Sequence, residues 1–492
     1  MSEQNIVLKI VEQRKKDIAR LGFSFGHKIP QKRTRPVTPF MQNKGVILEV
    51  KRASPSKGDI APNLDSAATA TAYCQNGASA ISCLTEENYF KGTLEDLQKV
   101  CAAVDKFSAE SGKPAPAVLR KDFLIDEEEI EIAYRCGADA VLLICGILPL
   151  EKLLCMAERC KELGIRALVE VRTKEDVQKA LELKKQFADT IVCGVNSRNL
   201  KDFTIDLLVP CQLKAELGGS VIFESGITTA AAAAKIGSMG FKGILLGEFA
   251  ARNPKKAGEF VKAFENSKED LSGKKWLEYA QLLNGKKLPL VKICGLTRAQ
   301  DVLLADQLGA AFVGFIFATE FERNVYGQRF EQIKQILPKV KAFKVAVVTR
   351  PQTPEAKAAA QLVKEGVLDF VQLHGIKYNE VPDYLMEVPH YFAVTGKSVE
   401  ETGQLFAYGE PRFLQDDKSH SYKSTDHLWL AGGVTAENVT ELINEFKPEL
   451  IDVSSGIEAE QKGVKSEEKM KFFFERVKAG VTTNKLVEHI SK

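Results

Sequence analysis

The chain has 492 residues, a length too great for one hydrophobic core but suited to two domains of about 250 residues each. Its 68 Lys and Arg residues nearly cancel its 65 Asp and Glu residues, and no arm or stripe concentrates the basic ones. This balance argues against a nucleic acid or a membrane surface as partner. No stretch reaches the ~18 apolar residues that a membrane-spanning helix needs, and the amino-terminal segment lacks an apolar signal core. We therefore expect a cytoplasmic protein that acts on small molecules.

The cysteine and histidine patterns give no indication of a metal site. Nine of the ten cysteines lie in the first half at irregular spacings, many of them inside apolar runs, as at Cys83, Cys145 and Cys193. Without a CxxC pair, buried reduced thiols are the better interpretation. The six histidines show no HExxH or similar ligand spacing, so we expect no metal.

The first half alternates short apolar runs with amphipathic stretches of helical spacing. Stretches such as 126–138 and 173–188 end near Gly or Ala, as expected for right-handed crossovers between parallel strands. The predicted strands are 46–51, 80–85, 117–123, 140–145, 167–171, 191–196, 221–226 and 243–248. Eight such units predict a closed (β/α)8 barrel, and we assign it to residues 1–268.

A helical, Lys-rich stretch at 254–287 separates the two halves, and its tail NGKK at 284–287 is the best boundary. We predict a helical linker at 269–288 and a second domain at 289–492. The predicted strands of that domain are 289–295, 312–317, 343–348, 370–374, 391–396, 412–416, 428–433 and 450–456. The fold class is α/β, with two tandem (β/α)8 TIM barrels; a single sheet of sixteen strands is the alternative.

One connection in the second half departs from this scheme. Only eleven residues, 417–427, separate Asp416 from Leu428. A parallel crossover usually takes about a dozen residues or more and contains a helix. We therefore predict that the sixth helix of the second barrel is missing or reduced to a turn.

Charged and amide side chains follow five strands of the first half, where a parallel barrel has its mouth. They are Glu49, Lys51, Lys121, Glu170, Asn196, Arg198, Glu224 and Ser225. A single charged residue at a strand end is more often solvated, but two lysines and three glutamates that converge indicate a site. In a partly desolvated pocket their pKa values move apart, which gives an acid and a base for proton transfers around a carbonyl group. Gly226 and Gly247, on neighbouring strands, leave backbone N–H groups free to bind a phosphate.

The strings LEVKRASPSKGDI (48–60), VLRKDFLID (118–126), LVEVR (168–172), GVNSRNL (194–200) and ESGI (224–227) resemble indole-3-glycerol-phosphate synthase over about 1–265. This resemblance implies ring closure of 1-(2-carboxyphenylamino)-1-deoxyribulose 5-phosphate, with loss of CO2 and water, and no cofactor. It implies that Lys121 is the general acid, that Lys51 holds the carboxylate or phosphate and assists the dehydration, and that Glu170 is the base or electrostatic partner of that step. The other implied site residues are Glu49, Asn196, Glu224, Arg198 and Ser225, with Pro55, Phe90, Phe123 and Leu200 as an apolar pocket. For Phe90 and Leu200, ordinary core packing is the alternative.

The strings VKICGLTRAQD (291–301), GFIF (314–317), VQLHG (371–375), LAGGVTAENV (430–439) and DVSSGIEAEQKGVK (452–465) resemble phosphoribosylanthranilate isomerase over about 289–482. The resemblance implies an aldose-to-ketose rearrangement with Cys294 as general base, Asp416 as general acid and Arg323 as a fork for the anthranilate carboxylate. It implies a phosphate cradle formed by Gly433, Ser455 and Gly456. His374 either lines this site or caps its strand.

The second half also departs from the isomerase pattern. The sequence DDKSHSYKSTDHLW replaces a Gly-rich stretch after the acid, Asp417 beside Asp416 makes the acid ambiguous, and no Ser-Pro precedes Arg323. Together the resemblances imply a bifunctional tryptophan-biosynthesis enzyme that acts on small phosphorylated anthranilate-sugar substrates. We expect a monomer that hands its product to tryptophan synthase. The alternatives are a monofunctional synthase with a degenerate second barrel, and another phosphosugar enzyme such as an epimerase.

Overall fold

The computed structural model describes residues 6–198, 204–286, 289–395, 405, 408–422 and 427–490, with side chains up to residue 480. The chain divides into two compact units, Met1–Glu269 and Asp270–Lys492. Each unit contains a closed barrel of eight parallel strands, as predicted. No helix of the described residues is long and apolar enough to cross a membrane.

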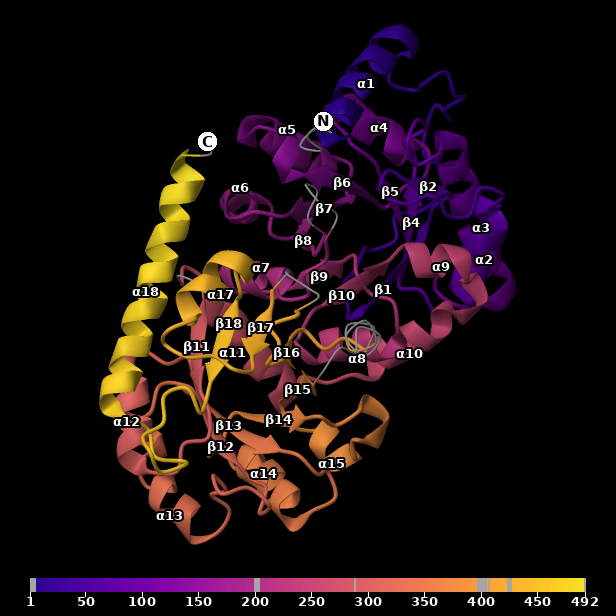
Figure 1. Cartoon of the computed structure of the whole chain (residues 1–492). Helices are drawn as coiled ribbons and strands as arrows, with labels where there is room; N and C mark the ends of the chain where they lie inside the picture. Colours follow the sequence, from indigo (N-terminus) through magenta and orange to yellow (C-terminus); the bar gives the residue numbers. More distant parts are fainter. Residues whose placement is uncertain are drawn as a thin grey trace. The chain divides into compact units, whose positions relative to one another are not determined.

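The first barrel closes through pairing of its first and last strands (Figure 1). Its strands are β1 (Gly45–Val50), β4 (Ala80–Leu84), β5 (Ala117–Lys121), β6 (Ala140–Ile144), β7 (Arg166–Val171), β8 (Ile191–Asn196), β9 (Val221–Glu224) and β10 (Gly243–Leu246). Its helices are α1 (Ile6–Leu21), α2 (Ser66–Gln75), α3 (Leu94–Ser111), α4 (Glu127–Arg135), α5 (Leu150–Glu162), α6 (Lys174–Phe187), α7 (Val209–Leu217), α8 (Ala230–Ser238), α9 (Glu248–Arg252) and α10 (Ala257–Asn266). All eight predicted strands are confirmed.

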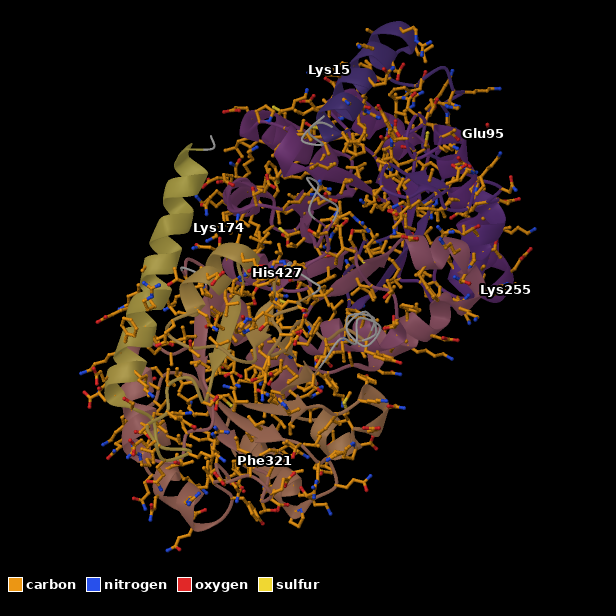
Figure 2. All side chains as sticks on the ribbon, viewed as in Figure 1. Lys15, Glu95, Lys174, Lys255, Phe321 and His427 are labelled. Carbon is orange, nitrogen blue, oxygen red and sulfur yellow. The ribbon has the colours of Figure 1, made fainter. Side chains whose placement is uncertain are left out.

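The local sequence explains both the apolar strands and the first turns of two helices. The strands are buried almost throughout, because a parallel barrel covers both faces of its sheet, so they appear as continuous apolar runs. Helices α3 and α6 each begin with a capping box, in which Thr93 pairs with Asp96 and Thr173 with Asp176. Charged side chains such as Lys15 and Lys174 project outward from the helices (Figure 2).

Helix α1 is fastened to the barrel by a buried ion cluster. The Arg14 guanidinium donates to both oxygens of Asp122, at 2.7 and 3.1 Å, and to Glu129 at 2.8 Å through Nε. Asp122 also accepts from Arg120 at 3.2 Å. Because Asp122 directly follows Lys121 at the end of β5, this cluster fixes α1 beside the mouth of the first barrel.

The second barrel is built from β11 (Leu290–Ile293), β12 (Phe312–Ile316), β13 (Phe343–Val348), β14 (Phe370–His374), β15 (His390–Thr395), β16 (Phe413–Asp416), β17 (Trp429–Ala431) and β18 (Leu450–Val453). Its strands pair in chain order, and β18 closes the ring against β11 (Figure 1). Its helices are α11 (Leu271–Leu283), α12 (Ala299–Leu308), α13 (Gln328–Lys334), α14 (Pro354–Lys364), α15 (Asp383–Met386), α17 (Val439–Phe446) and α18 (Glu467–Ile490).

Helix α11 lies within 269–288, the range predicted as a linker, and packs inside the second unit. Its Trp276 and Tyr279 are fully buried, and the rings of Phe370 and Trp429 lie 5.4 and 6.2 Å from the Trp276 ring. The Tyr279 hydroxyl donates to Glu449 at 2.6 Å. The helix therefore contributes apolar side chains to the core of the second unit.

The connection between β16 and β17 has the short form that the sequence predicts. Its described residues, 417–422 and 427, contain no helix. The Asp417 carboxylate accepts hydrogen bonds from the backbone N–H groups of Ser419 and Ser421, at 2.9 and 3.1 Å, and from the Ser419 hydroxyl. These bonds fold the first part of the connection into a compact turn.

Candidate active sites

A cavity of about 560 Å³ opens at the carboxyl ends of the strands of the first barrel. All the site residues predicted in the first half line it, except Leu200, which lies outside the described residues. These are Glu49, Lys51, Pro55, Phe90, Lys121, Phe123, Glu170, Asn196, Arg198, Glu224, Ser225, Gly226 and Gly247. Residues spread over about 200 positions of sequence thus meet in one space, because parallel strands end at one mouth.

Lys121 lies at the centre of the charged groups in this cavity. Its Nζ is 3.5 Å from Glu170 Oε2 and 3.6 Å from Glu224 Oε2, and its side chain is 15% exposed. Burial alone would lower the pKa of Lys121, but the carboxylates of Glu170, Glu224 and Glu49 outweigh it and raise the pKa above its ordinary value. Lys121 is therefore an ammonium ion at neutral pH, which can donate a proton.

The two glutamates that face Lys121 have different environments. Burial favours the neutral form of both, but Arg172 and Lys121 hold the pKa of Glu170 well below its usual range. The pKa of Glu224 is raised by burial and by the neighbouring Glu170 carboxylate. This is the separation of pKa values that allows one carboxyl group to be ionised while the other keeps its proton.

Glycines make room for these carboxylates. A Cβ atom on Gly194 of β8 would lie 2.2 Å from Glu224 Oε1, and one on Gly247 would lie 2.7 Å from Glu49 Oε1. Both distances are far below van der Waals contact. Gly247, which the sequence predicts as a phosphate residue, thus also leaves space for Glu49 in the cavity. It directly precedes the short helix α9.

One wall of the cavity is aromatic. The Phe90 and Phe123 rings are 6.0 Å apart, and the Lys51 ammonium lies 5.6 Å from the centre of the Phe90 ring. Lys51 Nζ also contacts Glu49 Oε1 at 3.1 Å. A planar aromatic carboxylate fits such a wall, with its ring against the phenylalanines and its charge near the ammonium.

The turn after β9 contains two successive residues with positive φ angles. Ser225 and Gly226 have φ angles of 73° and 78°, and the first of these is an unusual value for a residue with a side chain. A Cβ on Gly226 would lie 2.5 Å from Ile205. Two successive residues with positive φ turn the backbone sharply between β9 and the loop that leads to α8.

Sequence reasoning missed several residues that line this cavity. Ile6, Val7 and Ile10 of α1 contribute apolar surface, and Arg172 and Arg252 contribute positive charge. Arg172 stands two positions after Glu170 in the quoted string LVEVR, and that spacing was the available signal. The approach of α1 to the mouth had no local signal.

In the second barrel, Cys294 follows β11 and is 8% exposed. Burial raises the pKa of this thiol above its ordinary value, although the nearby ammonium groups of Lys292 and Lys465 act in the opposite direction. Lys292 is fully buried and donates to Asp452 and, at 2.8 Å, to Gln372 Oε1. The Lys292 ammonium is thus also bound by groups other than the thiol. Because burial has the larger effect on its pKa, Cys294 is a protonated thiol at neutral pH.

The two candidate acids have different partners. Asp416 ends β16, and its Oδ2 lies 3.9 Å from His374 Nε2 at the end of β14. Asp417 instead holds the turn at 417–421 through both carboxylate oxygens. Only Asp416 is paired with another predicted site residue, and His374 lies beside it at the mouth.

The predicted fork Arg323 is already paired. Its Nε and Nη2 donate to the two oxygens of Glu458 at 2.7 and 2.9 Å. Lys465 contacts the same carboxylate at 3.3 Å, and burial lowers the pKa of this lysine. Glu458 and Lys465 belong to the quoted string 452–465, but sequence reasoning gave them no role.

The predicted phosphate residues form two adjacent turns. A bridge joins Thr435 to Gly456, and a Cβ on Gly456 would lie 2.1 Å from the carbonyl oxygen of Val434. Gly433 has a φ of 63°, and the exposed Ser455 directly precedes Gly456. The sequence did not indicate His420, which contacts the Gly432 carbonyl oxygen at 2.9 Å through Nε2 and lies above Gly433.

Two family models match the chain in tandem. The model described as indole-3-glycerol phosphate synthase matches residues 8–263, and the model described as N-(5'phosphoribosyl)anthranilate (PRA) isomerase matches residues 291–476. Among the described residues, no cluster of His, Cys, Asp and Glu could hold a metal ion.

Similar proteins match one or both halves. A multifunctional tryptophan biosynthesis protein of Schizosaccharomyces pombe is 33% identical over 481 residues, which cover 89% of this chain and 60% of that protein. The chain thus spans about three fifths of the length of that relative. An indole-3-glycerol phosphate synthase of Bacillus cereus is 38% identical over 246 residues, 49% of this chain and 91% of that protein. A solved structure of phosphoribosylanthranilate isomerase from Thermotoga maritima is 30% identical and covers 39% of this chain and 99% of that one, with a TM-score of 0.34.

Proposed function

Because the chain belongs to the indole-3-glycerol phosphate synthase family, we propose that its first barrel converts 1-(2-carboxyphenylamino)-1-deoxyribulose 5-phosphate to indole-3-glycerol phosphate. We propose further that the second barrel makes this ketose from N-(5-phosphoribosyl)anthranilate, so that the chain is bifunctional. The observation that carries the proposal is the convergence of Lys121 with three glutamates in a cavity that also has an aromatic wall.

In the first reaction, Lys121 protonates the ketone oxygen as the aromatic ring carbon attacks the carbonyl carbon. Its raised pKa means that the group carries its proton before the reaction, and the three glutamates keep the ammonium in place. The wall of Phe90 and Phe123 holds the benzoate ring and leaves its carboxylate poorly solvated, which favours loss of CO2. In the final dehydration, Glu170, ionised at neutral pH, takes the proton that the substrate loses, and Lys51 gives a proton to the hydroxyl group that leaves as water. The turn of Ser225 and Gly226 holds the phosphate.

In the second reaction, Asp416 protonates the ribose ring oxygen, the ring opens, and Cys294 removes the proton from C2. The two turns around Gly433 and Gly456 hold the phosphate. Arg323 reaches the anthranilate carboxylate while Glu458 keeps its guanidinium in place. The buried Cys294 requires a step in which the thiol loses its proton, and Lys292 and Lys465 are the cations that favour this loss.

A binding measurement tests the bifunctional proposal. The reduced form of the ketose cannot cyclise, and it resembles the product of one site and the substrate of the other. Calorimetric titration of the full chain should therefore give two bound molecules per chain. The substitution Lys51→Ala should weaken one of the two binding events and leave the other unchanged. One molecule per chain would instead favour a monofunctional synthase with a degenerate second barrel.

We also propose that the protein works in the cytoplasm as a monomer and hands its product to tryptophan synthase. Each barrel is closed, and each unit contains a hydrophobic core of its own. Sedimentation equilibrium of the full chain tests the oligomeric state, and a mass twice that of the chain would contradict the monomer.

A further inference from the structure

A line of polar side chains connects β11 to β16 in the second barrel. The Lys292 ammonium donates to Asp452 and, at 2.8 Å, to Gln372 Oε1. Gln372 Nε2 lies 3.1 Å from His374 Nδ1, and His374 Nε2 lies 3.9 Å from Asp416 Oδ2. The proposed acid is thus connected, through a histidine and an amide, to a fully buried ammonium.

The orientation of the Gln372 amide is fixed by its surroundings. An ammonium group has three donors and no acceptor, so the amide atom that faces Lys292 must be the oxygen. The Tyr391 hydroxyl donates to the same oxygen at 3.0 Å. Gln372 is 2% exposed, and the reversed amide would place an NH2 group against the ammonium with no water to compensate. The amide nitrogen of Gln372 must therefore face His374.

This orientation also fixes the tautomer of His374. An amide nitrogen only donates, so His374 Nδ1 must be the unprotonated, accepting nitrogen of the ring. Burial lowers the pKa of His374; the Asp416 carboxylate opposes this effect and Lys292 adds to it. The imidazole is consequently neutral near pH 7, with its one ring proton on Nε2, the nitrogen that faces Asp416.

We propose that Gln372 holds His374 as the Nε2–H tautomer, and that His374 is a positioning residue for Asp416. The second part rests on the proposed isomerase function. The Nε2–H group points at one oxygen of Asp416, which leaves the other oxygen to give its proton to the ribose ring oxygen. The same N–H group then stabilises the carboxylate that remains. A separation of 3.9 Å exceeds a hydrogen bond, but such contacts tighten when substrate fills a site.

Nitrogen NMR of the full chain, labelled with 15N at histidine, tests the tautomer without substrate. The chain has six histidines, and the variant His374→Gln identifies the His374 signals by their loss. We expect a protonated Nε2 and an unprotonated Nδ1 at pH 7. His390 is an internal reference for a protonated Nδ1, because its Nδ1 lies 2.7 Å from the Val388 carbonyl oxygen and must carry a proton. A proton on Nδ1 of His374 would overturn the proposal.

Two substitutions test whether the Gln372 amide sets the protonation of His374 Nδ1. Gln372→Glu places a carboxylate oxygen against Nδ1, so this nitrogen should gain a proton and the ring should become charged. Tyr391→Phe is the matched control, since it removes one donor to the amide oxygen but leaves Lys292, and the tautomer should not change. A spectrum of Gln372→Glu in which Nδ1 stays unprotonated would refute the role of the amide.

Kinetics of the isomerase step test the positioning role. His374→Gln keeps an N–H donor near the place of Nε2 and should stay within about 5-fold of the parent kcat, whereas His374→Leu should lower kcat by about 10- to 100-fold with little change in KM. Equal kcat values for His374→Leu and the parent would overturn this role. A parent chain without isomerase activity would contradict the proposed function alone, since the tautomer is read without substrate.

Discussion

Replacing Lys121 by Met should remove most of the turnover of the first barrel. The ammonium lies 3.5 and 3.6 Å from two carboxylates, is 15% exposed and keeps a raised pKa, so it is the cation held between Glu170 and Glu224. Loss of a general acid typically costs a factor of ~10² to 10⁴, which corresponds to about 3 to 5 kcal/mol in the barrier. Methionine nearly preserves the volume of the side chain, so the cavity should keep its shape.

The assay is single-turnover cyclisation of 1-(2-carboxyphenylamino)-1-deoxyribulose 5-phosphate, followed by indole absorbance. The matched control is Lys15→Met on the exposed face of α1 (Figure 2), which makes the same substitution at a solvated lysine and should leave the rate unchanged. Circular dichroism of both variants confirms that they are folded. A rate for Lys121→Met within a few-fold of the parent would refute the assignment of Lys121 as the acid.

Three further predictions concern a glycine, a buried carboxylate and the thiol. Gly194→Ala places a Cβ 2.2 Å from Glu224 Oε1, so the Glu224 carboxylate must move. A displacement of about 1 Å should lower kcat of the cyclisation by ~10²-fold. An unchanged kcat would show that Glu224 can move without loss of activity. Glu449 is 3% exposed, and Arg412 lowers its pKa against the effect of burial. The ionised carboxylate therefore stabilises the folded state above an unfolded pKa of about 4.3, and this stabilisation is lost as the pH falls. In urea unfolding at pH 7, the free energy of unfolding of Glu449→Gln should be about 3 kcal/mol below that of the parent. This difference should shrink at acid pH, and a difference that grows at acid pH would contradict the prediction. Because burial raises the pKa of Cys294, the alkaline limb of isomerase kcat/KM should lie above pH ~8.5, and a limb below pH 7.5 would contradict it.

The barrel strands could be predicted from sequence because both faces of a parallel barrel are buried. A continuous apolar run such as Ala140–Ile144 needs no partner to be recognised, and the residues that follow each run must meet at one mouth. For this reason Lys121 and Glu224, about 100 positions apart, could be placed in one site before any coordinates. The short connection after Asp416 could likewise be predicted by counting residues.

Contacts that depend on distant side chains could not be predicted. Arg323 pairs with Glu458 across 135 positions, and Arg14 reaches Asp122 across 108, and neither pairing leaves a local pattern. Helix α11 has the composition of a linker. Its place in the core of the second unit depends on the contacts of Trp276 with Phe370 and Trp429, which lie far from it in sequence. The different partners of Asp416 and Asp417 could not be predicted either, because they depend on the backbone geometry of the turn that Asp417 holds.

Separate assays of the two half-reactions on the full-length chain test the account most directly. With N-(5-phosphoribosyl)anthranilate as substrate, Lys121→Met should accumulate the ketose and form no indole-3-glycerol phosphate. Cys294→Ala should leave that substrate unconsumed but cyclise added ketose at the parent rate. Consumption of N-(5-phosphoribosyl)anthranilate by Cys294→Ala at the parent rate, or failure of that variant to cyclise ketose, would contradict two independent active sites on one chain.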